Sequence, residues 1–488
     1  MKTPLEYFKE ISRIPRDSKN EKEIRNWLLN WAKERNFNTK TDNAGNILIE
    51  VPAKNYESAE NAHNIGKNTI VFQGHMDMVC QKTPESKHNF AKDPIKLVQE
   101  GDWLKAKDTT LGADNGIGIA MALALADNQE AQHPPLEFLF TVDEETGMTG
   151  ALQLSSDFIS GKTLINIDSE EVGIFTLGCA GGRETLITCP FYTTKLDKSL
   201  TVYHLTVTGA LGGHSGMDID KHRANTNVLL SRILFSINKK TNIRLLSVSG
   251  GTAHNAIPRH TEAYLAISHE TGMTELNLNK EIRRLEEEIK REYKNLEPNL
   301  SVILEKNNPS ADRKALTEKD SELLVQFFAA FPHGIYRMSP EVENLVETSN
   351  NFAIIDWRQN QVEITTSQRS SLYSGLLDIS YRIEALSYMA GAETEILTEY
   401  PNWEPNMDSP LLKRAIEVYK QLTGKEPQLE VVHAGLECGV IGSKYPGMDM
   451  ISLGPEIQGA HSPDERLYVP SVEEIYSFIK ALTASYCR

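Results

Sequence analysis

The sequence predicts an α/β protein whose mixed sheet lies between helices, interrupted by an inserted α+β domain. Over the first 186 residues, short apolar strands alternate with segments of helical periodicity, as in α/β proteins. From about Cys189 the strands become amphipathic, and near Glu399 the α/β pattern resumes. A chain of 488 residues is also too long for one ordinary core. We therefore expect one α/β domain from 1–186 and 397–488, and an inserted domain over 187–396.

The elements of the α/β domain follow from periodicity and turn residues. Apolar stripes predict helices within 4–36, and the Asn43–Asn46 turn leads into a strand at 47–51. The strands that follow are continuous apolar runs, which are typical of buried strands. The remaining expected elements are strands near 70–75, 136–142, 163–167, 428–432 and 448–453, and helices near 116–126, 411–422 and 472–484.

The inserted segment contains two successive groups of strands and helices. Their similar make-up suggests an internal duplication, although no matching residues prove it. The first group has expected strands at 201–209, 243–248 and 263–268 with helices at 225–235 and 276–293, and the second comprises 323–331, 362–367 and 372–389.

Bulk composition excludes several classes of partner. The net charge of −16 argues against nucleic acid and against an anionic membrane surface. No run of about 18 apolar residues occurs, and the N-terminus carries no signal-type apolar core, so neither a membrane span nor secretion is expected. The five cysteines are scattered and odd in number, which favours reduced thiols in a cytoplasmic protein.

The stretch from Thr69 to Val79 carries the first candidate for chemistry. Its apolar strand ends in Gly74, His75, Met76 and Asp77. Residues i and i+2 of a strand share a face, so His75 and Asp77 point the same way. A metal-bound imidazole commonly donates its other N–H to a carboxylate, a role that Asp77 suits. An isolated His-x-Asp could equally be a simple hydrogen-bonded pair.

Further acidic residues stand where strands end or a helix begins. Asp114 opens an apolar helix within a glycine-rich turn, where a lone aspartate is usually an N-cap. Glu144 and Glu145 follow a buried strand, and we expect these neighbours to point in opposite directions. Asp168 ends a third strand and is a weak signal alone.

Together, His75, Asp114, Glu145, Asp168 and His461 supply two imidazoles and three carboxylates. Zinc binds such nitrogen and oxygen ligands, and two metals can share one carboxylate and one hydroxide. Three carboxylates against two dications leave the site about one unit positive, which lowers the pKa of a bridging water. A carboxylate that binds no metal is then needed as general base, and Glu144 suits this role by adjacency.

Four motifs in this order resemble the co-catalytic zinc peptidase superfamily of aminoacylases, carboxypeptidases and dipeptidases. They are Gly74-His75-Met-Asp77, Gly112-Ala-Asp114-Asn-Gly, Asp143-Glu144-Glu145-Thr-Gly and Gly459-Ala-His461-Ser-Pro-Asp-Glu. The segments at Gly178–Glu184, Gly212–Gly216 and His433–Gly439 are similar to the aminoacyl-histidine (Xaa-His) dipeptidase branch. The resemblance covers essentially the whole chain.

This resemblance implies a zinc-peptidase catalytic domain with two Zn²⁺ ions, for which Co²⁺ or Mn²⁺ could substitute. His75 and Asp168 would hold one ion, Glu145 and His461 the other, and Asp114 would bridge them. Asp77 would orient His75, and Glu144 would be the general base.

The inserted domain resembles the lid domain of this family in its doubled form. In relatives with a doubled lid, a single chain completes its own active site. His214 would then donate to the oxyanion, and Asn255 and Arg369 would bind the substrate carboxylate. Gly435 would contribute backbone near that carboxylate. Surface roles are the alternative for these residues, and His254, Glu437 and Cys438 are expected to be structural.

The predicted activity is metal-dependent hydrolysis of dipeptides, Xaa-His and β-alanyl-His among them. One alternative is an amidohydrolase that deacylates N-acyl amino acids with the same site. A non-catalytic metal-binding protein is the third hypothesis, but such a chain should have lost Glu144 or a ligand. The expected partner is a dipeptide, with neither nucleic acid nor membrane, and the sequence is compatible with a homodimer.

Overall fold

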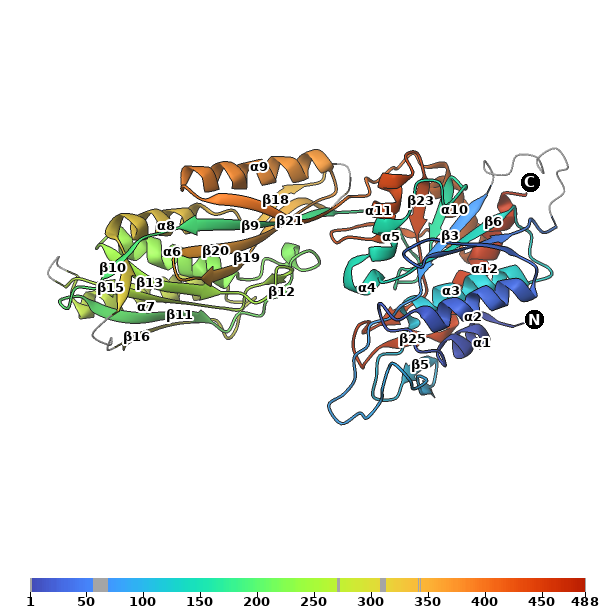
Figure 1. Cartoon of the computed structure of the whole chain (residues 1–488), viewed down its shortest axis with the longest axis horizontal. Coiled ribbons are helices and arrows are strands. Elements are labelled where there is room, and N and C mark those ends of the chain that lie inside the picture. Colours follow the sequence, from blue (N-terminus) through green and yellow to red (C-terminus); the bar gives the residue numbers. More distant parts are fainter. Residues whose placement is uncertain are drawn as a thin grey trace. The chain divides into compact units, whose positions relative to one another are not determined.

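The computed structural model describes residues 2–55, 69–269, 273–307, 313–340, 342 and 344–487. These residues form two compact units, coloured along the chain in Figure 1. The first unit comprises 1–179, 403–431 and 436–488, and the second comprises 180–402 and 432–435. The domain boundaries expected at 186/187 and 396/397 remain a prediction about how the chain divides.

The first unit is built on an eight-stranded mixed sheet in the order β1-β2-β6-β3-β7-β23-β8-β22. The predicted α/β class with a mixed sheet is therefore confirmed. Its strands are β1 (Asn38–Thr41), β2 (Ile47–Val51), β3 (Ile70–His75), β6 (Leu136–Thr141), β7 (Thr163–Asn166), β8 (Ile174–Cys179), β22 (Gln428–Val432) and β23 (Asp449–Ser452).

Helices cover both faces of this sheet. One face carries α1 (Pro4–Ile11), α3 (Ala113–Asp127), α10 (Pro410–Thr423) and α12 (Val469–Ser485), which contact one another. The other face packs against α5 (Thr149–Gln153) and α11 (Glu437–Lys444) through a shared apolar cluster. Helix α2 (Lys22–Glu34) lies against β1 and β2. Because α3 is apolar all round, it is buried almost completely.

Three adjacent parallel strands decide where chemistry can occur. Strand β3 pairs in parallel with β6 on one side and β7 on the other. The carboxyl ends of parallel strands meet at one edge of a sheet, which is where ligand sites of open α/β sheets lie. His75 ends β3, and the segments that follow β6 and β7 carry Glu144 with Glu145 and Asp168, so the sheet brings these side chains together.

A small four-stranded sheet supplies the remaining loops of this edge. Its order is β24-β25-β5-β4, with β4 (Leu97–Glu100), β5 (Trp103–Ala106), β24 (Ile457–Gln458) and β25 (Arg466–Tyr468). Because β25 pairs with β5, the late hairpin that carries His461 is joined to the segment that leads to Asp114.

The second unit contains a nine-stranded antiparallel sheet in the order β16-β11-β15-β13-β19-β20-β9-β21, with β18 beside β19. The strands are β9 (Gly181–Pro190), β11 (Thr201–Thr208), β13 (Ile243–Gly250), β15 (His260–Ile267), β16 (Ser301–Asn307), β18 (Gly334–Met338), β19 (Val346–Trp357), β20 (Gln361–Ser370) and β21 (Glu393–Tyr400). Helices α6 (Thr226–Asn238), α7 (Glu275–Glu292), α8 (Glu318–Ala330) and α9 (Tyr373–Met389) accompany it. Short pairs are β10 (Thr193–Lys195) with β17 (Lys314–Leu316), and β12 (Gly213–His214) with β14 (Ala256–Ile257).

The two halves of this sheet share one topology. In chain order one half runs β11-α6-β13-β15-α7-β16, and the other runs β9-α8-β19-β20-α9-β21. Counted outward from the middle of the sheet, the strands of one half lie in the order β13-β15-β11-β16 and those of the other in the order β19-β20-β9-β21. Both orders place the second strand of the half first, then its third, first and fourth strands. The halves meet where β13 pairs with β19. The duplication suggested from sequence remains a proposal, for which this shared order is a topological argument.

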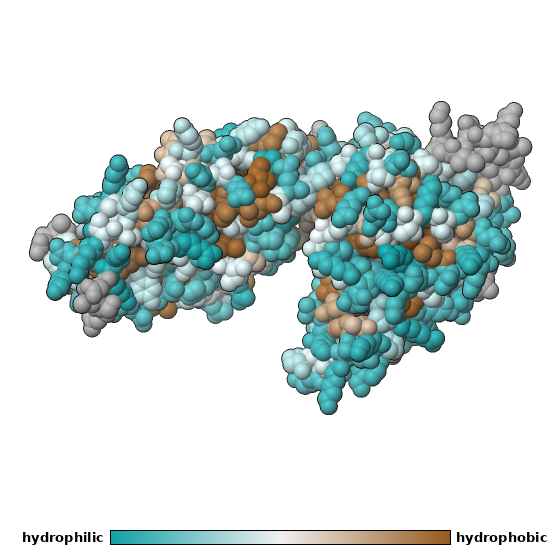
Figure 2. Space-filling model, viewed as in Figure 1, coloured by the Kyte–Doolittle hydropathy of each residue, from teal (hydrophilic) through white to brown (hydrophobic). Residues whose placement is uncertain are grey.

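The surface is mostly hydrophilic, with scattered hydrophobic side chains on the face shown in Figure 2. Exposed large side chains are ordinary for a folded surface, and the neighbours Tyr388 and Met389 of α9 are among the most exposed. Among the described residues, no helix has the length and apolarity needed to cross a bilayer.

Candidate metal centre and substrate-binding residues

His75 lies at the end of β3 and contacts three carboxylates. Its Nε2 is 3.0 Å from Asp114 Oδ1 and 3.2 Å from Asp168 Oδ1. On the other side of the ring, Nδ1 is 3.3 Å from Asp77 Oδ1. The imidazole is buried, so its orientation is fixed by packing and by these neighbours. One ring nitrogen therefore faces the acidic cluster while the other faces Asp77.

Asp77 is fully buried and joins two loops of the site. Ser18 Oγ donates to its Oδ2 at 2.8 Å, and the main-chain N–H groups of Glu144 and Glu145 donate to its two oxygens at 3.1 and 3.2 Å. Burial alone would raise the pKa of Asp77, but the contacts with His75 and the Glu144 amide outweigh it and lower the pKa to about 2. Asp77 thus stays ionised and holds the β3 loop against the loop after β6.

Asp114 lies between the two histidines. Its Oδ1 faces His75 Nε2, and its Oδ2 lies 3.1 Å from His461 Nε2. The same His461 nitrogen is 3.1 Å from Glu145 Oε2. The contacts form two groups, each with one imidazole and one further carboxylate, that share Asp114. This is the arrangement in which one carboxylate can bridge two cations.

Glu144 and Glu145 differ in placement from the sequence-based expectation. They do not end a strand; they open the short helix α4 (Glu144–Gly147), because Asp143 adopts a left-handed φ of 51° after β6. Thr146 and Thr149 both donate hydroxyl hydrogen bonds to the Asp143 carboxylate, which stabilises this turn. Burial raises the pKa of Glu144 well above its usual value. The charge of His75 opposes this shift, and nearby carboxylates add to it.

The cluster fits divalent cations on its own donor chemistry. Burial raises the pKa of Asp168 to about 7, whereas hydrogen bonds that His461 donates to the carboxylates of Asp114 and Glu145 raise the pKa of His461 to about 11. These shifts mean that the acidic groups attract protons when no other cation balances them. Glu145 Oε1 is buried and has no hydrogen-bond partner among the described residues. Imidazole nitrogens and carboxylate oxygens are ligands that zinc accepts.

Two buried side chains that were not expected at the site support these loops. The Glu465 carboxylate accepts hydrogen bonds from the four successive main-chain N–H groups of 111–114, at 2.7 to 3.4 Å. It therefore fixes the Asp114 turn to the His461 hairpin. The Arg16 guanidinium donates to the carbonyl oxygens of Met76, Asp77 and Gly112. Glu465 belongs to a motif that the sequence showed, but no local signal marks Arg16.

Two further acidic residues were not assigned to the site. Glu437, expected to be structural, is buried and accepts hydrogen bonds from Gln73 and Thr141 at 2.6 and 2.7 Å. Glu170 has an oxygen within 4.8 Å of ligand atoms of Asp114 and His461. Burial, then the charge of Asp114, raises the pKa of Glu170 to about 8.

In the second unit, His214 has a defined hydrogen-bonding state. Its Nδ1 accepts from the main-chain N–H groups of Gly216 and Met217 at 3.3 and 3.1 Å. Burial, followed by the positive charge of Arg369, lowers the pKa of His214 to about 4. The ring is therefore neutral near pH 7 and carries its proton on Nε2, which makes Nε2 a hydrogen-bond donor.

Arg369 is a buried cation in the same unit. Its guanidinium donates to Tyr400 Oη at 2.7 Å and to Ser215 Oγ at 3.5 Å, and its Nε has no hydrogen-bond partner. Within the described part of the chain, no carboxylate forms a salt bridge with it. Gly435 lies against the Tyr400 ring, where an added Cβ would come within 2.7 Å of Cε2. An unpaired buried guanidinium is costly, so this position suits an anionic ligand.

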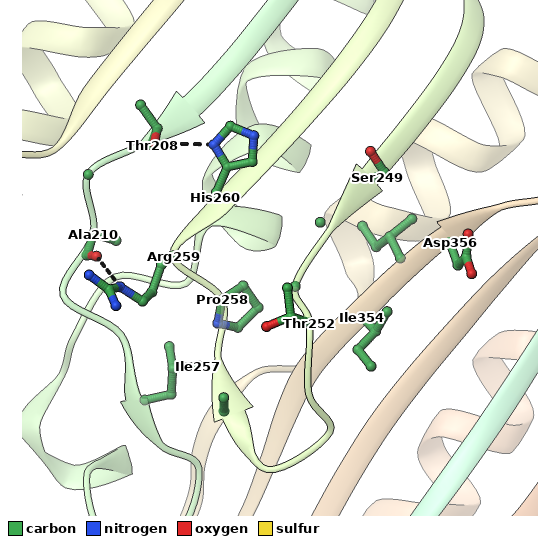
Figure 3. A pocket seen from close by; sticks show the side chains of 15 residues that line it. Thr208, Ala210, Ser249, Thr252, Ile257, Pro258, Arg259, His260, Ile354 and Asp356 are labelled. Atoms are coloured by element: carbon green, nitrogen blue, oxygen red, sulfur yellow. Dashed lines mark hydrogen bonds between the residues drawn. The ribbon is translucent and has the colours of Figure 1, made fainter. Parts of the chain in front are cut away.

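Asn255 lies in the exposed turn before β14, and its carbonyl accepts from the Ser215 N–H at 2.8 Å. It is thereby linked to the His214 and Arg369 group. A cavity of about 690 Å³ beside this turn is lined by Thr252, Ala256 and Arg259, among others (Figure 3). The Arg259 side chain donates to the Ala210 carbonyl rather than remaining unpaired.

Comparison with known proteins assigns the chain to a protein family. The model of peptidase family M20/M25/M40 matches residues 71–485, a range that contains every residue of the candidate metal centre. The chain belongs to peptidase family M20/M25/M40. Membership of this family implies a dinuclear metal centre, which agrees with the fit of the donor set described above.

Relatives of this M20 peptidase match nearly its whole length. The cytosol non-specific dipeptidase of Escherichia coli is 38% identical over 475 residues, covering 97% of this chain and 96% of the relative. The aminoacylhistidine dipeptidase of Vibrio alginolyticus has a crystal structure with a TM-score of 0.90 and 36% identity, covering 99% and 96% of the two chains. Aminopeptidase PepT of Bacillus cereus, at 16% identity and a TM-score of 0.57 over 99% and 98% of the two chains, shares the fold.

Proposed function

We propose that this M20 peptidase is a metallo-dipeptidase that hydrolyses dipeptides with a free carboxylate, Xaa-His and β-alanyl-His among them. The observation that carries the proposal is the 38% identity to a dipeptidase over 97% of the chain. The name of that relative also supports a cytosolic location. Zn²⁺ is the proposed metal at both positions, with Co²⁺ or Mn²⁺ as substitutes.

In this proposal, His75 and Asp168 would hold one cation, Glu145 and His461 would hold the other, and Asp114 would serve both. The two cations, when bound, acidify a water and offset negative charge that develops on the substrate. Asp77 orients His75, because its ionised carboxylate lies against Nδ1. The Glu465 contacts keep the Asp114 turn in place before any substrate arrives.

Glu144 is the proposed proton carrier. It takes a proton from the attacking water and delivers it to the leaving amine, as general base and then general acid. Burial raises the pKa of Glu144, which makes the ionised carboxylate a stronger base toward the water while leaving its protonated form able to act as the acid in the second half of this relay.

The inserted unit supplies the proposed substrate contacts. The His214 Nε2–H donates to the oxyanion of the tetrahedral intermediate, and its neutral state keeps that donor available near pH 7. Arg369 binds the substrate carboxylate through its Nε–H, which has no other partner among the described residues. The Tyr400 hydroxyl holds the guanidinium, and Gly435 packs against the Tyr400 ring. Asn255 is a second proposed contact for that carboxylate.

A substrate panel on the purified, metal-analysed enzyme tests the proposal. Ala-His and β-alanyl-His should be hydrolysed, and N-acetyl-His, which lacks the ammonium group and one carbon of the alanyl residue, should not. Ala-Leu measures the preference for histidine. Removal of metal with a chelator should abolish turnover, and Zn²⁺, Co²⁺ or Mn²⁺ should restore it. Faster hydrolysis of N-acetyl-His than of Ala-His would favour the deacylase alternative and overturn the dipeptidase proposal.

A further inference from the structure

Glu170 stands on the His461 side of the candidate metal centre without an assigned role. One of its carboxylate oxygens lies within 4.8 Å of ligand atoms from both Asp114 and His461. No hydrogen bond or salt bridge of this carboxylate occurs within the described part of the chain. Its neighbour Glu171 is exposed to solvent, so the two adjacent glutamates have different environments.

The backbone holds Glu170 at this position from two sides. The Ile457 N–H donates to the Glu170 carbonyl at 2.8 Å, which ties the segment to β24, just before the His461 turn. The preceding residue, Ser169, passes so close to Gly454 that an added Cβ there would lie 1.6 Å from the Ser169 carbonyl oxygen. Glu170 is therefore placed by the same C-terminal segment that places His461.

The surroundings of Glu170 point to a cation. The carboxylates of Glu170 and Asp114 both lie beside the single His461 imidazole, with ligand atoms of all three residues within 4.8 Å of one another. Glu145, which contacts the same histidine, is nine-tenths buried and keeps its Oε1 without a partner. Burying several like charges together is costly unless a cation balances them.

We propose that Glu170 is an additional carboxylate ligand for the divalent cation on the His461 side of the dinuclear centre. This inference rests on the proposed dinuclear site and adds a sixth protein residue to it. With Glu170 included, four carboxylates face two dications, so the site is neutral rather than positive. The expected consequence is tighter retention of the cation that the more exposed His461 holds.

The test compares Glu170→Gln with Glu171→Gln, which removes the same charge one residue away at an exposed position. Full-length protein is stripped with a chelator and titrated with Zn²⁺ by calorimetry, with indicator competition for tight sites. Glu170→Gln should weaken the second Zn²⁺ by about 10- to 100-fold, the range seen when residues that support a metal ligand are removed. The first Zn²⁺ and the Glu171→Gln protein should bind as in the wild type.

The outcomes separate this inference from the proposed function. Unchanged binding of both ions by Glu170→Gln, or equal weakening in both variants, would overturn the role of Glu170 while leaving the dipeptidase proposal intact. A wild-type protein that binds fewer than two Zn²⁺ ions would instead contradict the dinuclear site itself. If Glu170→Gln does not fold, Glu170→Asp is the second variant, because it keeps the charge but moves the carboxylate oxygens away from the site. Its affinity for the second Zn²⁺ should still be lower than that of the wild type. Wild-type affinity would overturn the inference. Visible spectra of Co²⁺-loaded protein report the coordination change independently of activity.

Discussion

The two units leave opposite charges unmatched. In the first unit, carboxylates crowd around His75 and His461, and Glu145 retains a buried oxygen without a partner. In the second unit, a buried guanidinium, Arg369, has neutral partners and an unsatisfied Nε. One region is therefore prepared for cations and the other for an anion.

The regions also differ in how their residues are held. The acidic site stands on three adjacent parallel strands, with Glu465, Arg16 and Asp77 tying its loops together. The residues of the second unit lie on turns and a strand end, and Asn255 is exposed. Changes in the acidic site should therefore affect kcat most, whereas changes at Arg369 should affect substrate selection.

The largest expected effect comes from Glu144→Gln, which preserves shape but removes the proton carrier. Turnover should fall by about 10²- to 10⁴-fold, as is typical when a general acid–base group is lost. Metal content should stay at the wild-type level, since Glu144 is not a proposed ligand; steady-state kinetics with elemental analysis measure both. A variant that keeps more than about a tenth of wild-type kcat would remove Glu144 from the mechanism.

His214 offers a matched pair of substitutions that tests the donor assigned to Nε2. Asn places its amide near the Nδ1 position and Gln places its amide nearer to Nε2. Since Nε2–H is the proposed oxyanion donor, His214→Asn should lower kcat by about 10²- to 10³-fold with little change in KM. His214→Gln should recover part of this loss. Equal kcat values for the two variants would contradict the assigned donor.

Arg369→Lys tests whether the second unit binds an anion. Loss of a charge-assisted hydrogen bond of about 1.5–3 kcal/mol should lower kcat/KM for Ala-His by about 10- to 150-fold. The amide Ala-His-NH₂, which lacks the carboxylate, is the matched control substrate. Wild-type enzyme should prefer the free acid, and this preference should be smaller in the variant, since lysine keeps the charge but not the forked geometry of the guanidinium. An unchanged ratio of the two kcat/KM values would show that Arg369 does not bind the carboxylate.

The smallest effect concerns stability and uses a histidine outside both regions. His133 is fully buried, and burial lowers its pKa to about 4 although its Nδ1 lies 2.8 Å from the Pro134 carbonyl oxygen. The unfolded chain, with a histidine pKa near 6.5, binds the proton first, so the free energy of unfolding falls as pH drops below about 6.5. The decrease attributable to His133 is about 2 kcal/mol between pH 7 and pH 5.

His133→Asn provides the comparison, because its amide can replace the Nδ1 donor but does not titrate. Urea denaturation at pH 7 and pH 5 should show a smaller pH-dependent loss of stability in this variant than in the wild type. Metal content and kcat at pH 7 should be unchanged, which separates His133 from the functional clusters. Identical pH slopes for the two proteins would refute the buried neutral state of His133.

Much of the acidic site could be predicted because its residues follow recognisable strands. An apolar run that ends in His75 and Asp77, and similar runs before Glu144 and Asp168, are local patterns. The expected placement of Glu144 and Glu145 at a strand end was wrong, because they open helix α4 after a left-handed turn at Asp143 that the following threonines stabilise. Side-chain hydrogen bonds that reshape a turn are weak signals in a one-dimensional pattern.

The supporting residues could not be predicted, because their partners are distant in the chain. Arg16 donates to carbonyls 60, 61 and 96 residues away, and Glu465 accepts from amides more than 350 residues away. Neither contact leaves a spacing that sequence alone displays. Glu170 is two residues from the predicted ligand Asp168, yet only the backbone contact with Ile457 explains why it, and not Glu171, lies by the site.

The sequence by itself determined the chemical types available: two imidazoles and several carboxylates at strand ends, an apolar framework, and a long inserted segment. Only the tertiary structure decided which oxygens face His75 and which face His461, which nitrogen of His214 carries the proton, and that Arg369 is buried without a carboxylate. The reason is physical. Residue type and strand position are local properties of the chain, whereas charge balance and hydrogen-bond satisfaction depend on neighbours that only folding brings together.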